Sequence, residues 1–163
     1  KSPGLRMDEQ SRKIALRMIS YGVYILTSKV ESEVSAATVT WVSQASFKPP
    51  MLSVCIKRDS GPYKVIKERK EFLLHMLGKH QKDLASKFFK PSEVENSCIN
   101  GVKYELLNDL PLITSAPAHL LCSVLEIIEK GDHPLFLTEV KDVKVKENIE
   151  PLELRKTGWS YGG

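Results

Sequence analysis

The sequence predicts a mainly β fold in which an antiparallel sheet closes into a barrel, with a few short helices around it. Two observations predict this class. At least six segments have the β-branched, aromatic or alternating composition of strands, whereas only three short segments have helical spacing. The two longest β segments, 118–129 and 135–146, are separated only by a short turn. Many strands with few helical interruptions favour antiparallel closure.

The first part of the chain is expected to form one helix followed by strands. Residues 8–20 combine an acidic start with apolar side chains at helical spacing, and Gly22 is expected to end that helix. Those apolar side chains are Ile14, Ala15, Met18 and Ile19. Residues 23–27 then predict a short apolar strand, and 34–42 a longer strand rich in β-branched residues.

A turn and a second helix frame the next strand. Pro49-Pro50 forces a turn, and the continuous apolar character of residues 52–56 predicts a strand buried on both faces. Ser60 is a typical N-cap, and Pro62 is tolerated in a first helical turn. A helix is therefore expected from Ser60 to about Lys70.

The middle of the chain is less regular. Residues 71–77 are expected to form a strand and residues 81–89 a helix. Residues 90–117 contain several Pro, Asn and Gly signals, which predict an irregular segment with one strand near 103–107.

The two long strands close the predicted fold. In the second one, Glu139 and Lys141 interrupt an apolar face and indicate a bulge. The apolar residues of that face are Leu135, Leu137, Val143 and Val145. A short segment, 152–155, then precedes the glycine-rich tail 158–163.

Length and charge restrict the class of protein. A chain of 163 residues predicts a single domain, 1–163. The net charge of +4 is mild, and its basic residues alternate with acidic ones, so no nucleic-acid partner is expected. No apolar run is long enough for a membrane span, and no signal peptide opens the chain.

The cysteines and histidines indicate where the protein works and what it does not bind. Cys55, Cys98 and Cys122 form no CxxC pair, which indicates reduced thiols and a cytoplasmic location. His75 and His80 have no carboxylate at metal-site spacing, so no metal site is expected.

The segment where the 52–56 strand meets the second helix is the first candidate site. Lys57, Ser60 and the N–H of Gly61 can meet an anion at the positive end of a helix dipole. The simpler interpretation is a charged loop and an ordinary N-cap. A phosphate is the ligand that this combination of donors favours.

Several segments together resemble the flavin reductase-like family of FMN-binding split barrels, over nearly the whole chain. The segments are TVTWVSQASFKPPMLSVCIKRDS (38–60), FLLHML (72–77), Asp83-Leu84-Ala85 with Phe88, LLC (120–122), Gly131-Asp132-His133 and GWSYGG (158–163). The resemblance implies a six-stranded antiparallel split β-barrel with a few short helices. It also implies a homodimer that binds FMN, or sometimes FAD, at the subunit interface.

The resemblance implies a set of cofactor-binding residues. A flavin ring is expected against the hydroxyl-rich strand and the neighbouring strand edge, and its phosphate near the loop that follows residue 56. The implied residues are Thr38, Val39, Thr40, Trp41, Cys55, Ile56, Lys57, Ser60, Gly61, Phe88, Trp159 and Tyr161. By default the two threonines are sheet formers and Trp41 is a core residue.

The resemblance also implies that His133 faces the flavin and helps to dock a nicotinamide, as the catalytic residue. An exposed turn histidine is the alternative. Two positions depart from the family pattern. His75 stands where the family has Asn, and Pro62 stands where Thr is common, which removes one hydroxyl and one N–H.

Three functions remain open at this stage. The first is an NAD(P)H-dependent flavin reductase that passes electrons to free flavin, oxygen or a partner such as a monooxygenase. The second is a non-catalytic, flavoredoxin-like FMN electron-transfer protein. The third is a split barrel without flavin that binds another planar ligand.

Overall fold

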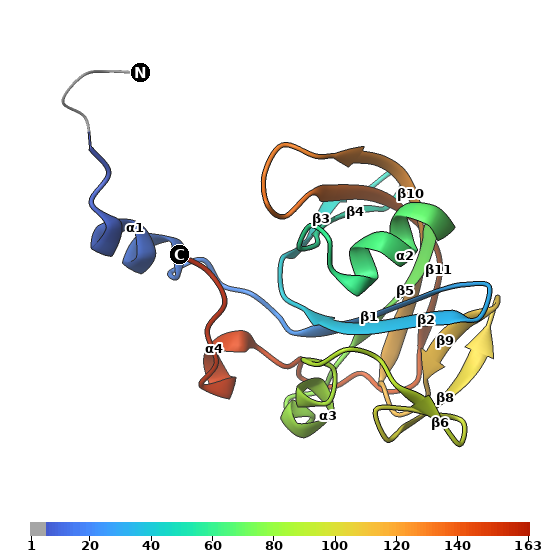
Figure 1. Ribbon diagram of the computed structural model, residues 1–163. Helices are drawn as coiled ribbons and strands as arrows, with labels where there is room; N and C mark the ends of the chain where they lie inside the picture. The colour runs from blue at the N-terminus through green and yellow to red at the C-terminus, as the bar shows by residue number, and fades with distance from the viewer. Residues whose placement is uncertain (1–5) are drawn as a thin grey trace.

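The computed structural model describes residues 6–163 and confirms the mainly β class (Figure 1). Seven strands form the main sheet, and their order is β2-β1-β5-β10-β11-β4-β3. In chain order they are β1 (Tyr24–Val30), β2 (Glu33–Val39), β3 (Val42–Ser46), β4 (Met51–Cys55), β5 (Glu71–Met76), β10 (Ala118–Ile128) and β11 (Leu135–Val145). All neighbouring strands of this sheet are antiparallel.

The predicted closed barrel of six strands is wrong, because β2 and β3 stand at opposite ends of the main sheet and do not pair. The predicted strand 34–42 is in fact two strands separated at Thr40-Trp41. The free edge of β2 is instead contacted by the segment after α3 (Lys82–Ser86). The amide of Thr38 donates to the Phe88 carbonyl at 3.3 Å, and the amide of Ala36 donates to Ser92 Oγ at 2.9 Å.

A second, four-stranded sheet occupies much of the segment predicted to be irregular. Its strands are β6 (Val94–Glu95), β7 (Cys98–Ile99), β8 (Val102–Leu107) and β9 (Leu110–Ile113). The strand near 103–107 is confirmed as β8, and its partner β9 was missed. Asn108 and Asp109 both have φ in the left-handed region, as a tight hairpin turn requires. Asn-Asp is a weaker signal for this turn than Asn-Gly, so the hairpin escaped prediction.

The main sheet has apolar clusters on both faces. In β1, Ile25 belongs to the cluster with Leu77 and Phe88, whereas the next residue, Leu26, belongs to the cluster with Phe72. This change of face with every residue is the two-residue period of a strand. The second cluster is closed by α2 (Gly61–Arg69) through Tyr63 and Ile66.

Strands β4 and β11 depart from the predicted burial patterns. In β4, Leu52 and Val54 are buried, but Met51, Ser53 and Cys55 are only half-buried, so burial on both faces is wrong. In β11, Phe136 and Thr138 are buried, and the predicted apolar face is not. The bulge is confirmed, because the register of β10 with β11 passes over Lys141.

The helices are shorter than predicted, and α1 (Glu9–Leu16) packs differently from expectation. Asp8 caps it, and none of its residues is buried. The apolar side chains that set the predicted spacing are solvent-exposed, including Ile14, Met18 and Ile19. In Figure 1, α1 stands apart from the sheets, next to the C-terminal segment. Helix α3 has five residues instead of nine, and a further helix, α4 (Leu154–Thr157), begins within segment 152–155.

Residues 6–163 contain neither a membrane-spanning helix nor a cluster of metal-binding side chains. No helix there has the length and apolar character that crossing a bilayer requires. In the same residues, no three His, Cys, Asp or Glu side chains gather in a group able to hold a metal ion.

Candidate functional site

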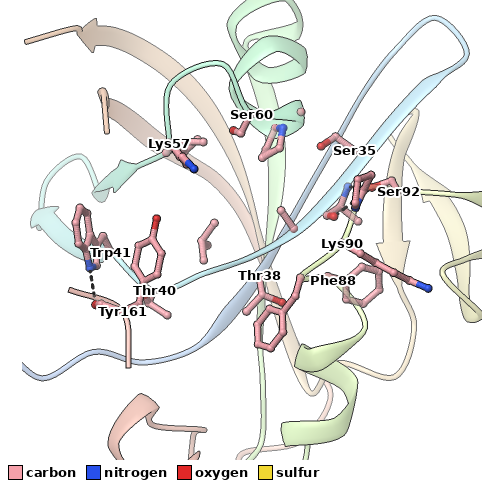
Figure 2. A pocket seen from close by; sticks show the side chains of 18 of the residues that line it. Ser35, Thr38, Thr40, Trp41, Lys57, Ser60, Phe88, Lys90, Ser92 and Tyr161 are labelled. Carbon is pink, nitrogen blue, oxygen red and sulfur yellow. Dashed lines mark hydrogen bonds between the residues drawn. The ribbon is translucent and has the colours of Figure 1, made fainter. Parts of the chain in front are cut away.

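A cavity of about 660 Å³ lies between β2, the end of β4, the start of α2 and the C-terminal tail; we call it the main cavity. All thirteen residues singled out from the sequence line it, although they come from five separate parts of the chain. They are Thr38, Val39, Thr40, Trp41, Cys55, Ile56, Lys57, Ser60, Gly61, Phe88, His133, Trp159 and Tyr161. Figure 2 shows Lys57 and Ser60 at one end, with Trp41 and Tyr161 together on one side. The volume lies within the usual range of ligand sites.

Thr38 and Thr40 both line the main cavity but differ in what their hydroxyls do. Thr38 Oγ1 donates to the Ala85 carbonyl at 2.6 Å, so this hydroxyl holds α3 against β2. Thr40 is only 9% exposed, and its Oγ1 has no hydrogen-bond partner. A buried hydroxyl without a partner costs free energy, so Thr40 is the polar residue of the cavity wall whose hydrogen bonding is incomplete among residues 6–163.

The corner between β4 and α2 supplies the donors at one end of the main cavity. Ser60 is confirmed as the N-cap of α2, and its Oγ accepts from the Tyr63 amide at 3.3 Å. Its hydroxyl hydrogen therefore remains able to donate. Pro62 has no N–H, so the Gly61 N–H is the only orphan backbone donor left in the first turn. Lys57 is exposed at the same corner.

Arg58, the next residue, is not among the residues that line the main cavity. Its side chain instead forms hydrogen bonds with the turn between β10 and β11. Its guanidinium donates to the carbonyls of Gly131 at 2.9 Å and Glu129 at 3.1 Å. It also approaches the Glu129 carboxylate at 3.3 Å, and the Arg58 amide donates to the Asp132 carbonyl at 2.9 Å. Arg58 thus fixes the turn that carries His133. The sequence suggested only a cationic loop here and gave no sign of this contact.

His133 is held on both sides by side chains. Its Nδ1 lies 2.9 Å from Asp132 Oδ1, and its Nε2 lies 2.5 Å from the Tyr161 hydroxyl. The His133 side chain is 15% exposed, so it is not the fully exposed turn histidine of the alternative interpretation. The hydrogen bond from His133 lowers the pKa of Asp132 below its ordinary value. Burial, with Asp132 nearby, raises the pKa of Tyr161.

Trp41 joins His133 to the tail. Its ring lies 4.4 Å from the His133 ring and 5.3 Å from the Tyr161 ring, measured between centroids. Its Nε1 donates to the Tyr161 carbonyl at 3.4 Å, shown by the dashed line in Figure 2. Trp41 is half-buried against the main cavity and is not a core residue.

The tail, residues 158–163, is anchored at its start. It leaves α4 through Gly158, whose φ of 85° lies in the left-handed region that favours glycine. The Trp159 ring then packs edge-on against Phe89 with centroids 4.8 Å apart, and Lys82 Nζ lies 5.1 Å from the Trp159 ring. Both aromatic residues of the tail therefore face the main cavity from a fixed position.

Other lining residues were not expected from the sequence. Ser35, Lys90 and Ser92 line the end of the main cavity opposite Trp41 (Figure 2), and Pro91 also lines the cavity. The only signal for the last three was the Lys-Pro-Ser sequence after Phe89, inside a segment that read as irregular. Cys55 is half-buried on the cavity wall, and burial raises the pKa of its thiol.

His75 lies outside the main cavity and has a structural role. It is fully buried in β5, and its Nδ1 donates to the Ile25 carbonyl at 3.0 Å. Its Nε2 accepts from the Ile113 amide at 2.9 Å. Mainly because of burial, the pKa of His75 falls to about 4, so the ring is neutral. This departure from the family pattern therefore joins β5 to β1 and β9 and does not alter the site.

The chain belongs to the flavin reductase like domain family, whose family model matches residues 16–159. The family expected from the sequence is therefore confirmed. It covers the main sheet and every residue that lines the main cavity except those of the tail after Trp159.

Two curated relatives illustrate the family. Diflavin flavoprotein A 1 of Synechocystis is 30% identical over 151 residues, which are 90% of this chain and 26% of the relative. The reductase component of a 4-nitrophenol 4-monooxygenase from Rhodococcus opacus is 28% identical over 76% of this chain and 65% of the relative. The chain spans about half or less of the length of several curated relatives that it matches.

Two solved structures share the fold. The flavin reductase PheA2 matches with a TM-score of 0.77 and 27% identity, over 96% of this chain and 98% of PheA2. The NADH:FAD oxidoreductase SgcE6 of Streptomyces globisporus, solved with NAD and FAD fragments, matches with a TM-score of 0.72 and 26% identity. That match covers 83% of this chain and 81% of SgcE6.

Proposed function

We propose that the main cavity binds a flavin and that the protein is an NAD(P)H-dependent flavin reductase. FMN is the expected flavin, and FAD is the second choice. The observation that carries the proposal is the main cavity itself, which cationic, hydroxyl and aromatic side chains from five separate parts of the chain line together. Family membership and the names of the relatives support it.

The residues present fit a flavin phosphate at the corner between β4 and α2. Lys57 supplies a positive charge, and Ser60 and Gly61 supply an O–H and an N–H. A charge-assisted hydrogen bond contributes about 1.5–3 kcal/mol, so these donors are sufficient for a specific anion site. Pro62 removes a fourth donor, which makes Lys57 more important here than in a relative with a full set of N–H groups.

The residues between Val39 and Ile56 fit a flavin ring. Val39, Cys55 and Ile56 form an apolar wall for the ring. Phe88 and Trp159 close the wall from the segment after α3 and from the tail. A bound flavin supplies the redox chemistry, accepting a hydride from a reduced nicotinamide, and no side chain has to act as acid or base.

His133 is proposed as the residue that docks the nicotinamide. It lies at the edge of the main cavity, and Asp132 and Tyr161 fix its ring. A contact of this kind orients two reactants and needs no proton transfer.

We also propose a homodimer with the flavin at its interface, and electron transfer to free flavin or to a partner such as a monooxygenase. The exposed apolar side chains of α1 support the dimer, because a second copy can bury them. The relative from Rhodococcus opacus, named as a reductase component, supports the partner. The three unpaired cysteines support a cytoplasmic location.

One observation favours an FMN electron carrier as the second candidate. The Tyr161 hydroxyl already bonds His133 Nε2, so the tail occupies the space that a nicotinamide would use beside this ring. A carrier would leave this contact undisturbed, whereas a reductase has to open it.

The test is an absorbance spectrum of the purified protein, followed by titration with NADH and NADPH without oxygen. A reductase is yellow, or becomes yellow with FMN or FAD, and one of the two nucleotides bleaches it. Bleaching by dithionite but by neither nucleotide supports the carrier. A protein that stays colourless with both flavins contradicts the proposed function.

A further inference from the structure

A second cavity, of about 220 Å³, lies on the other side of the tail from the main cavity. Its walls come from the end of α1 with the residues after it, from α4 and from the tail. The lining residues are Arg17, Ile19, Ser20, Tyr21, Leu154, Arg155, Gly158, Trp159, Ser160 and Tyr161. It is smaller than the usual site of a whole ligand, roughly 300–1,000 Å³, and suits a part of one.

The charged side chains of the second cavity are two arginines, and no carboxylate side chain lines it. Arg17 Nε donates to the Gly162 carbonyl at 3.0 Å, and Arg155 Nη2 donates to the Met18 carbonyl and Ser20 Oγ, both at 3.4 Å. Among the ion pairs of residues 6–163, none includes either arginine. Each guanidinium is therefore held in place by neutral acceptors and still has donors for an anion.

The remaining lining residues have the character of a nucleotide site. Tyr21, Trp159 and Tyr161 contribute aromatic side chains, and Ser20 and Ser160 contribute hydroxyl-bearing side chains. Tyr21 also continues the aromatic cluster, because its ring centroid lies 6.2 Å from that of Trp41. Rings for a base, hydroxyls for a ribose and guanidinium groups for a phosphate thus lie within one small cavity.

The two cavities share a wall. Leu154, Trp159, Ser160 and Tyr161 line both of them. Across this wall stands His133, bonded to the Tyr161 hydroxyl. The two cavities are therefore adjacent, as a ligand with two linked halves, one in each, requires.

We propose that the second cavity binds the adenosine phosphate half of a dinucleotide whose other half lies in the main cavity, with Arg17 and Arg155 contacting the phosphate. This inference rests on the proposed function, because it assumes a redox ligand in the main cavity. Two dinucleotides contain this half, the electron donor NAD(P)H and the flavin FAD. The same cavity chemistry serves either one.

The first experiment measures binding of adenosine 2′,5′-bisphosphate and of ADP to the protein by calorimetry, which needs no flavin reduction. We expect the double variant R17Q/R155Q to bind both roughly tenfold or more weakly, since two charged contacts are lost. The control is R12Q, because Arg12 is also exposed on α1 but lines neither cavity. Absence of binding, or equal affinity of both variants, overturns the inference even if the flavin spectrum supports the proposed function.

The second experiment identifies the dinucleotide. If NAD(P)H uses the second cavity, R17Q/R155Q raises the KM for NADH or NADPH and leaves FMN and FAD affinity unchanged. If FAD uses it, FAD affinity falls and FMN affinity does not. Either result supports the inference. A variant that changes neither the KM nor the FAD affinity contradicts it.

Discussion

Two histidines, His75 and His133, lie in regions of opposite character. His75 is fully buried in the main sheet, and both of its ring nitrogens bond backbone groups of other strands. His133 lies on a turn, and its ring nitrogens bond the side chains of Asp132 and Tyr161 beside the main cavity. The comparison shows that the hydrogen-bond partners of a histidine, more than the residue type itself, decide whether it has a structural or a functional role. Backbone partners fix a histidine into the fold, whereas side-chain partners can be exchanged for a ligand.

The largest expected effect is on protein stability and tests the structural role of the buried His75. His75→Ala removes the ring's hydrogen bonds to the Ile25 carbonyl and the Ile113 amide and opens a void in the core. The free energy of unfolding should fall by about 3–5 kcal/mol, measured by urea denaturation at pH 7.5. The exposed His80 provides the control, His80→Ala, which should change little. Equal unfolding midpoints for the two variants would break the comparison.

The pH dependence of the free energy of unfolding also tests the structural role of His75. Because the pKa of His75 is about 4 in the folded protein and 6.5 ordinarily, the unfolded chain binds the proton first as the pH falls. The stability contributed by neutral His75 is complete above pH 6.5 and is lost between pH 6.5 and 4, by about 3 kcal/mol.

Urea denaturation at several pH values measures this loss. The control is His75→Asn, whose amide does not titrate, and the slope should become shallower in that variant. His119 remains in both proteins, and because burial also lowers the pKa of His119, it contributes in the same direction. An unchanged slope in His75→Asn argues against the assignment.

On the cavity side, Lys57→Ala is expected to weaken FMN binding by roughly tenfold or more, because a charged contact contributes about 1.5–3 kcal/mol. Stability should hardly change, since Lys57 is exposed. FMN fluorescence quenching gives the affinity. Lys64→Ala is the matched control, because Lys64 is exposed on α2 and does not line the main cavity. Unchanged affinity would remove Lys57 from the phosphate site.

The smallest expected effect concerns His133 itself. His133→Ala should slow NAD(P)H oxidation by about fivefold, equivalent to the loss of one hydrogen bond of about 1 kcal/mol, while the flavin is retained. Stopped-flow bleaching of the flavin measures the rate, and filtration measures retention. Release of the flavin would show that His133 holds the cofactor and does not dock the donor.

The sequence predicted the elements near the main cavity well, for physical reasons. Ser60 before Gly61-Pro62 defines a helix start locally, and the structure has it there. The Pro49-Pro50 turn and the run 52–56 likewise depend on neighbouring residues alone, and β4 begins at Met51. The thirteen site residues were gathered mainly by the family resemblance, since no local signal links Phe88 or Tyr161 to Thr38.

What the sequence missed depends on long-range contacts. The division of segment 34–42 at Thr40-Trp41 follows from where β2 and β3 pair, which the β-branched composition does not reveal. The apolar spacing of α1 correctly predicted a helix, but the helix buries no residue. The hydrogen bonds between Arg58 and the turn before His133 join residues that are more than 70 positions apart in the sequence.

The hydrogen bonds of Arg58 connect two parts of the candidate site. Arg58 lies between Lys57 and Ser60 in the chain, and its guanidinium forms hydrogen bonds with the turn that carries His133. Lys57 and Ser60 are therefore tied to His133 through the contacts of a single side chain. A displacement of either part strains the Arg58 contacts unless the other part moves with it.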